Sequence, residues 1–140
     1  ILDRATKRIR VLIVDDHWVV RDGLKSVLEL QTDIEVVGQA ENGKEAVKKV
    51  GELSPDIVVM DIVMPEMNGL EATKVIYQKY PRTRVVMLSQ YDDEANILAA
   101  EQIGAYGFIP KRAASSQVVN AIRAIHYVGQ RLQRPSPVSG

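Results

Sequence analysis

The chain has 140 residues, enough for about one domain, and 46% of them are hydrophobic, so it can bury a single core. Eighteen basic and eighteen acidic residues give a net charge of zero, which excludes the strongly basic surface of a domain that grips nucleic acid alone. The lack of cysteine excludes a disulfide framework and a thiolate metal site, and two histidines are too few for a histidine-rich one.

The predicted elements alternate between short apolar strands and amphipathic helices. Strands are expected at residues 10–14, 34–40, 56–60, 84–88 and 106–109. Three of them contain segments that are apolar throughout, as is typical of parallel strands covered on both faces.

Between the strands, apolar residues recur with the helical period of 3.6. The predicted buried stripes are Val20, Leu24, Val27 and Leu28; Ala46, Val47, Val50 and Leu53; Leu70, Thr73, Val75 and Ile76; Ile97, Ala100 and Ile103; and Val118, Ala121, Ile122 and Ile125. Five strands that alternate with five helices predict an α/β fold, a doubly wound parallel sheet with right-handed crossovers and helices on both faces.

The two ends of the chain are expected to lie outside this folded unit. The last helix is predicted to stop at Gly129, which leaves residues 130–140, rich in proline and serine, as a linker or disordered tail. Residues 1–8 are expected to form an N-terminal arm, so the domain spans 9–129. The chain starts without methionine, which suggests a fragment, and it has neither an apolar run of ~20 residues nor a signal segment, so we expect a cytoplasmic protein without membrane contact.

Polar residues gather where the predicted strands end. In open α/β sheets, ligands bind outside the carboxyl ends of the strands. These ends carry Asp15 with Asp16, Asp61, Ser89 and Lys111. Clustered carboxylates suit Mg²⁺, which would also offset their mutual repulsion.

Each of these residues also has a purely structural interpretation. Two acids after a strand can be solvated residues at a helix start, where the helix dipole favours them. Ser89 can be an ordinary strand-end hydroxyl and Lys111 an exposed cation. Asp61 is harder to explain in this way, because it follows a buried strand and precedes a turn-forming loop at 62–69. The main reason to expect a binding site is therefore that all these residues lie together at the ends of the predicted strands.

Four other residues invite a chemical interpretation that we consider weaker. His17 and His126 are expected to be surface or packing residues rather than ligands. Met64 and Met67 are expected to pack the loop after the third strand.

Four segments resemble the receiver domain of bacterial two-component response regulators, in the branch that carries a LuxR-type helix-turn-helix. They are "VLIVDDH" with the following "VR" and "GL", "DIVVMDIVMPEMNGLEAT", "VVMLS" and "GAYGFIPK". The resemblance covers about residues 9–129. It implies a flavodoxin-like (βα)5 fold with strand order 2-1-3-4-5.

The resemblance also implies site roles. Asp61 corresponds to the phosphoryl acceptor, and Asp16 to the principal Mg²⁺ carboxylate. Asp15 corresponds to the second acid, which acts mainly through a metal-bound water. The backbone carbonyl of Val63 falls at the remaining metal-ligand position, and Lys111 corresponds to the lysine that contacts phosphate.

Two further residues correspond to the switch of the family: Ser89 to its hydroxyl and Phe108 to its aromatic ring. The chain departs from the family pattern in two places. Phe108 has no hydroxyl, and Lys111 is preceded by Pro110 and followed by Arg112 instead of proline. Pro110 withholds a ladder hydrogen bond, so it fits only if the fifth strand lies at an edge and ends there.

The implied function is a phosphorylation-controlled signalling switch that takes its phosphoryl group from a sensor histidine kinase and is not a turnover enzyme. DNA would be bound only through an output domain missing from this chain. Phosphorylation is expected to promote a homodimer through Val19, Val119 and Tyr127, apolar residues that the predicted stripes do not need.

Three alternatives stay open at this point. A stand-alone receiver would relay phosphate or dock a partner other than DNA. A phosphatase of the haloacid dehalogenase type would need Asp-x-Asp after its first strand, whereas the acids here are adjacent. A flavin site would need a loop rich in Ser, Thr and Gly after the first strand, and none follows.

Overall fold

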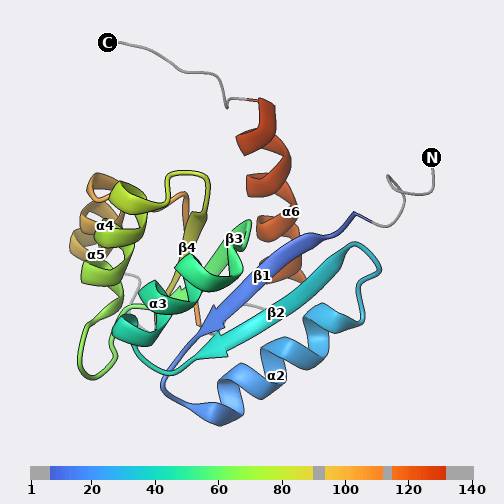
Figure 1. Ribbon diagram of the computed structural model, residues 1–140, viewed down its shortest axis with the longest axis horizontal. Coiled ribbons are helices and arrows are strands. Elements are labelled where there is room, and N and C mark those ends of the chain that lie inside the picture. The colour runs from blue at the N-terminus through green and yellow to red at the C-terminus, as the bar shows by residue number, and fades with distance from the viewer. Residues whose placement is uncertain (1–6, 90–93, 112–114, 132–140) are drawn as a thin grey trace.

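A computed structural model describes residues 7–89, 94–111 and 115–131. In these residues five parallel strands form one sheet with the order β2-β1-β3-β4-β5 (Figure 1), as the resemblance predicted. The strands are β1 (Ile9–Val14), β2 (Ile34–Ala40), β3 (Ile57–Asp61), β4 (Arg84–Ser89) and β5 (Gly107–Pro110).

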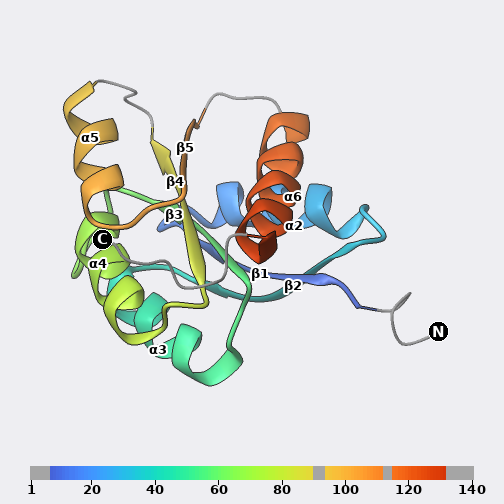
Figure 2. The same ribbon diagram turned by 90° about the horizontal axis from the view of Figure 1, so that it is seen from above.

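Helices cover both faces of the sheet. Figure 2 shows α2 and α6 on one side and α3 and α4 on the other, with α5 beside α4. The helices are α2 (Trp18–Glu29), α3 (Gly43–Leu53), α4 (Gly69–Lys79), α5 (Glu94–Gln102) and α6 (Ser115–Arg131). None of the helices in the described residues is long and apolar enough to cross a membrane.

The core consists of two apolar layers, one on each face of the sheet. Leu12 and Val58 face α3 and α4, whereas Val11 and Val59 face α2 and α6. Because successive side chains of a strand point to opposite faces, a strand buried on both sides must be apolar throughout. This explains why the central strands are uninterrupted apolar runs.

Two helices begin with asparagine caps close to the carboxyl edge of the sheet. The side chain of Asn42 accepts a hydrogen bond from the Glu45 amide at the start of α3. Asn68 and Glu71 form a reciprocal capping box at the start of α4. These caps fix where both helices start, and so they fix the loops that lead into them.

Several sequence predictions are wrong in detail, and the predicted bounds of β1, β3 and β4 each differ by one residue at one or both ends. Strand β5 starts at Gly107 rather than at Tyr106, although it does end at Pro110 on the edge of the sheet. Helix α6 continues beyond Gly129 to Arg131, because one glycine costs a helix only about 1 kcal/mol. Val119, which we expected on a dimer surface, is 5% exposed in the core beside α2, because the apolar stripe of α6 is wider than predicted.

Most of the other stripe residues are buried or half-buried as predicted. The side chains of Ile97 and Ala100, predicted members of the α5 stripe, lie outside the described part of the structure.

Candidate functional site

Four of the predicted site residues meet at the carboxyl edge of the sheet. Asp15 and Asp16 directly follow β1, Asp61 is the last residue of β3, and Lys111 directly follows β5. Parallel strands end at the same edge, so residues far apart in sequence converge there. Ser89 ends β4, but its side chain lies outside the described part of the structure.

Lys111 lies between two buried carboxylates. Its Nζ atom is 2.9 Å from Oδ2 of Asp15 and 3.2 Å from Oδ2 of Asp61. The Lys111 side chain is only 14% exposed, and those of Asp15 and Asp61 are 0% and 5% exposed. The structural interpretations of Lys111 as an exposed cation and of Asp15 as a solvated acid are therefore wrong.

The site holds more negative charge than its lysine neutralises. Burial raises the pKa of Asp61, the charge of Asp15 raises it further, and the opposing effect of Lys111 does not cancel these two. Burial lowers the pKa of Lys111, but its contacts with Asp15 and Asp61 outweigh burial and leave that pKa raised. Additional positive charge would therefore be favourable here.

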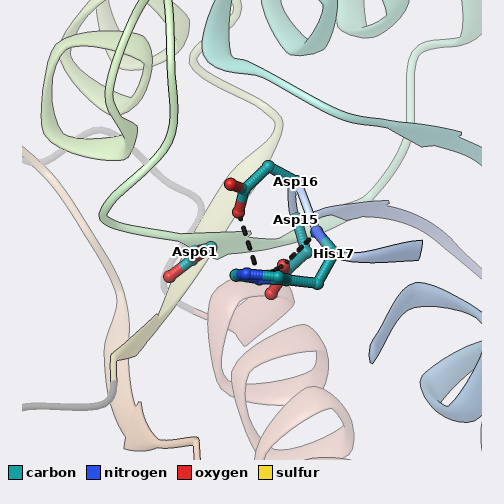
Figure 3. Close-up of side chains that lie close together, drawn as sticks. All are labelled: Asp15, Asp16, His17 and Asp61. Atoms are coloured by element: carbon teal, nitrogen blue, oxygen red, sulfur yellow. Dashed lines mark hydrogen bonds and ion pairs between the residues drawn. The ribbon is translucent and has the colours of Figure 1, made fainter. Parts of the chain in front are cut away.

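The acids fit a hard divalent cation such as Mg²⁺. Asp15, Asp16, His17 and Asp61 each offer one ligand atom, and these atoms lie within 4.8 Å of one another (Figure 3). Oδ1 of Asp16 is buried and has no hydrogen bond of good geometry, although Nδ1 of His17 lies 3.3 Å away. Oδ2 of Asp15 also lacks a hydrogen bond of good geometry, although Lys111 is close enough for an ion pair. A cation held by oxygen ligands would satisfy such atoms.

His17 lies at the rim of this acidic group. Its Nδ1 atom is 3.1 Å from Oδ1 of Asp15 and 3.3 Å from Oδ1 of Asp16 (Figure 3). The ring is largely exposed, which confirms its predicted surface position. Mg²⁺ prefers oxygen ligands, so the carboxylates are the better candidates.

Backbone contacts hold the turn that carries the two acids. The Asp15 amide donates to the carbonyl of Ala40 in β2 (3.1 Å), and the His17 amide donates to Oδ1 of Asp15 (2.8 Å). Arg21 in α2 donates from Nη1 to the carbonyl oxygen of Asp15 (2.5 Å) and from Nε to Gln39 (3.2 Å). Sequence reasoning assigned neither residue a role: Arg21 appeared only as part of the "VR" in the family resemblance, and nothing in the sequence distinguishes Gln39 from other polar residues.

The loop after Asp61 is closed by its own backbone. The Ile62 amide donates to the carbonyl of Leu88 (3.2 Å), and the Gly69 amide donates to the carbonyl of Ile62 (2.7 Å). A Cβ atom on Gly69 would lie 2.1 Å from the carbonyl oxygen of Asp61, so only glycine fits there. This close approach fixes the start of α4 against the end of β3.

The rest of this loop divides into packed and exposed residues. Met64 is buried and Met67 packs against the same core, which confirms their predicted packing role. Val63 is 67% exposed, and Glu66 adopts a positive φ of 70°. Phe108, the predicted switch residue, pairs with Met87 in the sheet and is half-buried against that core.

The fold and the site together define a class: a doubly wound domain with three carboxylates and a lysine where its strands end. Residues 11–123 match the response regulator receiver domain, and the chain belongs to that family. Receiver domains of this kind act in phosphorylation-dependent two-component signalling.

Individual relatives agree with this assignment. The chain is 42% identical over 124 residues to the transcriptional regulatory protein LnrK of Bacillus subtilis (strain 168), which covers 89% of this chain and 56% of LnrK. A two-component response regulator of the LuxR family from Aurantimonas sp. SI85-9A1 is 34% identical, with a TM-score of 0.83 and 87% of both chains covered.

A chain of the CheX–CheY–BeF3–Mg²⁺ complex from Borrelia burgdorferi is also similar. It is 28% identical, with a TM-score of 0.80, and the match covers 85% of this chain and 90% of that chain. This chain spans about half the length of the curated relatives it matches, 55% or 56% for three of them.

Proposed function

We propose that this domain accepts a phosphoryl group on Asp61 from a phosphohistidine of a sensor kinase and changes conformation in response. The observation that carries this proposal is the position of Lys111, whose ammonium group lies within 3.2 Å of the buried Asp61 carboxylate at the carboxyl edge of the sheet. A phosphoryl group bound there would meet a cation that is already in place.

The transfer requires little covalent help from the protein. An ionised carboxylate is itself the nucleophile, so Asp61 needs no general base. One Asp61 oxygen forms the new bond to phosphorus while the bond from phosphorus to the donor histidine nitrogen breaks. The main requirement is neutralisation of the negative charge gathered there, and Lys111 supplies part of it.

The remaining charge would be neutralised by Mg²⁺. Asp16, Asp61 and the Val63 carbonyl would hold the ion, and Asp15 would act mainly through a water. When bound, Mg²⁺ supplies positive charge and orients a phosphoryl oxygen. The buried Oδ1 atom of Asp16, which has no hydrogen bond of good geometry, supports this role, as does the Mg²⁺ named in the related CheY complex.

The switch follows from the new charge on Asp61. A phosphoryl group adds oxygens that accept hydrogen bonds, and the hydroxyl of Ser89 would donate to one of them. Such a bond would draw the end of β4 towards Asp61 and make room for the Phe108 ring, so the face formed by α5, β5 and α6 would change. Phosphorylation biases an equilibrium between two existing states.

The output lies in other molecules or in the rest of the protein. Because the chain spans about half of its relatives and LnrK is named a transcriptional regulator, we assign DNA binding to a LuxR-type output domain outside this chain. A homodimer formed on phosphorylation would use the exposed residues Val19 and Tyr127, without Val119. The domain catalyses only its own phosphorylation and dephosphorylation.

Intact-mass measurement after incubation with acetyl phosphate and Mg²⁺ tests the proposal. The parent should gain the mass of one phosphoryl group, and Asp61→Asn or excess chelator should abolish that gain. The matched control is Asp33→Asn, which removes an aspartate on the opposite edge of the sheet and should leave the gain intact. A gain that persists in Asp61→Asn would refute Asp61 as the acceptor.

A further inference from the structure

The first residue of α3 touches the loop that follows Asp61. The amide of Gly43 donates a hydrogen bond to the carbonyl oxygen of Met67 at 2.9 Å, and Gly43 is buried. A Cβ atom on Gly43 would lie 2.2 Å from that oxygen and 2.9 Å from the carbonyl carbon, whereas ordinary contacts begin at 3.4 Å. Because real Cβ contacts shorter than 3.0 Å essentially do not occur, any side chain here must move the two backbones apart.

A special backbone angle does not explain this glycine. Among the glycines that the structure describes, Gly104 is the one with a positive φ, so an L residue could adopt the backbone of Gly43. The atom that an added methyl group would meet belongs to backbone, which cannot rotate away as a side chain does. Close approach of two chain segments is thus the reason for glycine at this position.

Both partners of this contact lead directly into the site. Met67 belongs to the loop that starts after Asp61 and contains Val63, and this loop is closed by the hydrogen bond between Gly69 and Ile62. Helix α3 follows β2, whose last residue accepts the hydrogen bond from the Asp15 amide. The Gly43–Met67 contact therefore joins the acid-bearing turn after β1 to the loop after β3.

The start of α3 is held from its own side. The Asn42 side chain accepts from the Glu45 amide at 2.7 Å, and Oε1 of Glu45 accepts from the Glu41 amide at 2.8 Å. If the helix start moved away from Met67, it would strain this cap and the β2 end that holds Asp15. If it stayed, the loop would move instead. Either response displaces a part of the site.

We propose that Gly43 is a positioning residue for phosphoryl transfer, because it lets the start of α3 hold the loop that directly follows Asp61 and contains the Val63 carbonyl. The role rests on the proposed function of Asp61. Gly43 touches no reacting atom and acts only through Met67. A misplacement of about 1 Å can lower the rate of a positioned reaction about a hundredfold.

The test compares Gly43→Ala with Gly23→Ala. Gly23 lies in α2, and a Cβ atom added there meets nothing within 4 Å, so this control makes the same chemical change in open space. With acetyl phosphate and Mg²⁺, we expect Gly43→Ala to be phosphorylated at least about tenfold more slowly than the parent. Gly23→Ala should stay within about twofold of the parent rate.

Two further readouts separate positioning from a loss of stability. In the folded variant, the Mg²⁺ dissociation constant from an NMR titration should rise several-fold, because the loop that bears the Val63 carbonyl is displaced. In metal-free protein, the amide at position 43 should exchange its hydrogen faster than in the parent. A parent-like rate together with a parent-like Mg²⁺ constant in folded Gly43→Ala would overturn the proposal.

A second variant decides the matter if Gly43→Ala does not fold. Asn42→Ala removes the cap that holds the helix start and adds no atom to the contact. It should shift the Mg²⁺ constant and the rate in the same direction by at least about twofold, and parent-like values would overturn the proposal. If the parent gained no phosphoryl mass, the proposed function would be refuted. The role of Gly43 in positioning the loop would still be tested by the Mg²⁺ dissociation constants of the parent and the variants.

Discussion

Two aspartates at opposite ends of the sheet have carboxyl groups with opposite pKa shifts. Asp33, just before β2, receives two hydrogen bonds of 2.8 Å from the Arg123 guanidinium, and these lower its pKa. Asp61, at the end of β3, has its pKa raised by burial and by the charge of Asp15. The Asp33 carboxylate thus holds α6 against the chain before β2. The Asp61 carboxylate, in contrast, lies where its negative charge is unfavourable.

The wider surroundings of the two aspartates follow the same division. At the amino end of the sheet, Arg10 donates from Nη1 to the carbonyls of Leu53 and Ser54, which terminate α3. One exception there is Nε of Arg84, which is buried without a hydrogen-bond partner while its guanidinium lies 5.6 Å from the centre of the Tyr106 ring; Nδ1 of His126 is another buried nitrogen without such a partner. Charges at this end mostly hold elements together, whereas at the carboxyl end buried carboxylates outnumber the one lysine between them.

The largest effect that would test this division is the loss of Lys111. In the presence of a chelator, Lys111→Met should lower the free energy of unfolding by about 2–4 kcal/mol, because it leaves the buried Asp15 and Asp61 without their cation. Urea denaturation followed by circular dichroism measures this change. Mg²⁺ should restore part of the loss by binding to the same acids.

The matched change at the amino end is Arg123→Met, which also removes one cation from an aspartate. This pair is more exposed, at 37% and 33%, so its loss should cost less than about 1 kcal/mol. If both variants lost the same free energy of unfolding, the two ends of the sheet would not differ in the way proposed, with charges that hold elements together at one end and carboxylates in excess at the other.

A second prediction is that one substitution at the site stabilises the protein, whereas most substitutions destabilise it. In the presence of a chelator at pH 7, Asp61→Asn should raise the free energy of unfolding by about 1 kcal/mol. A carboxyl whose pKa is raised by folding destabilises the fold once it is ionised, so stability falls as the pH rises through the folded pKa. The neutral amide avoids that cost.

Denaturation at two pH values checks this sign. The advantage of Asp61→Asn should shrink at acidic pH, where the parent carboxyl is protonated as well. Because Mg²⁺ stabilises the ionised acids, it should reduce the difference at pH 7. A variant that is less stable than the parent at pH 7 without metal would contradict the prediction.

The sequence was sufficient for the parts of the structure that depend on periodicity and chain order. Apolar runs that are buried on both faces defined the central strands, and the rule for parallel sheets placed Asp15, Asp61 and Lys111 together before any distance was known. The metal-bound and switch roles of Asp16, Val63, Ser89 and Phe108 stay predictions, because they concern a ligand or a second state.

The remaining features depend on tertiary contacts that leave no periodic signal. In the sequence, Gly43 looks like an ordinary glycine at a helix start. Only the structure shows that a Cβ atom there would lie 2.2 Å from the carbonyl oxygen of Met67, so that the position requires glycine. Arg21 looks like a solvent-facing residue of α2 but reaches the carbonyl of Asp15. Val119 lies one position from the predicted stripe and was misplaced because stripe width depends on what the helix packs against.

The smallest predicted effect concerns the pH dependence of the Asp33–Arg123 pair. A carboxyl whose pKa is lowered by folding stabilises the fold above the pKa of the unfolded chain, about 4, and loses that contribution as the pH falls through the folded pKa. Asp33→Asn should therefore be less stable than the parent at pH 7 by less than about 1 kcal/mol, and the difference should vanish in acid.

Urea denaturation at low ionic strength from pH 7 downwards measures this difference, and added salt should weaken it because the pair is partly exposed. In an Arg123→Met background, which lacks the partner cation, Asp33→Asn should have almost no pH-dependent effect. The contribution of Asp33 to the free energy of unfolding should rise with pH, whereas that of Asp61 should fall. Both trends can be measured in one protein under one set of conditions. If Asp33→Asn instead gained stability at neutral pH, as Asp61→Asn should, then raised carboxyl pKa values would be general in this fold and would not mark the carboxyl edge as the functional one.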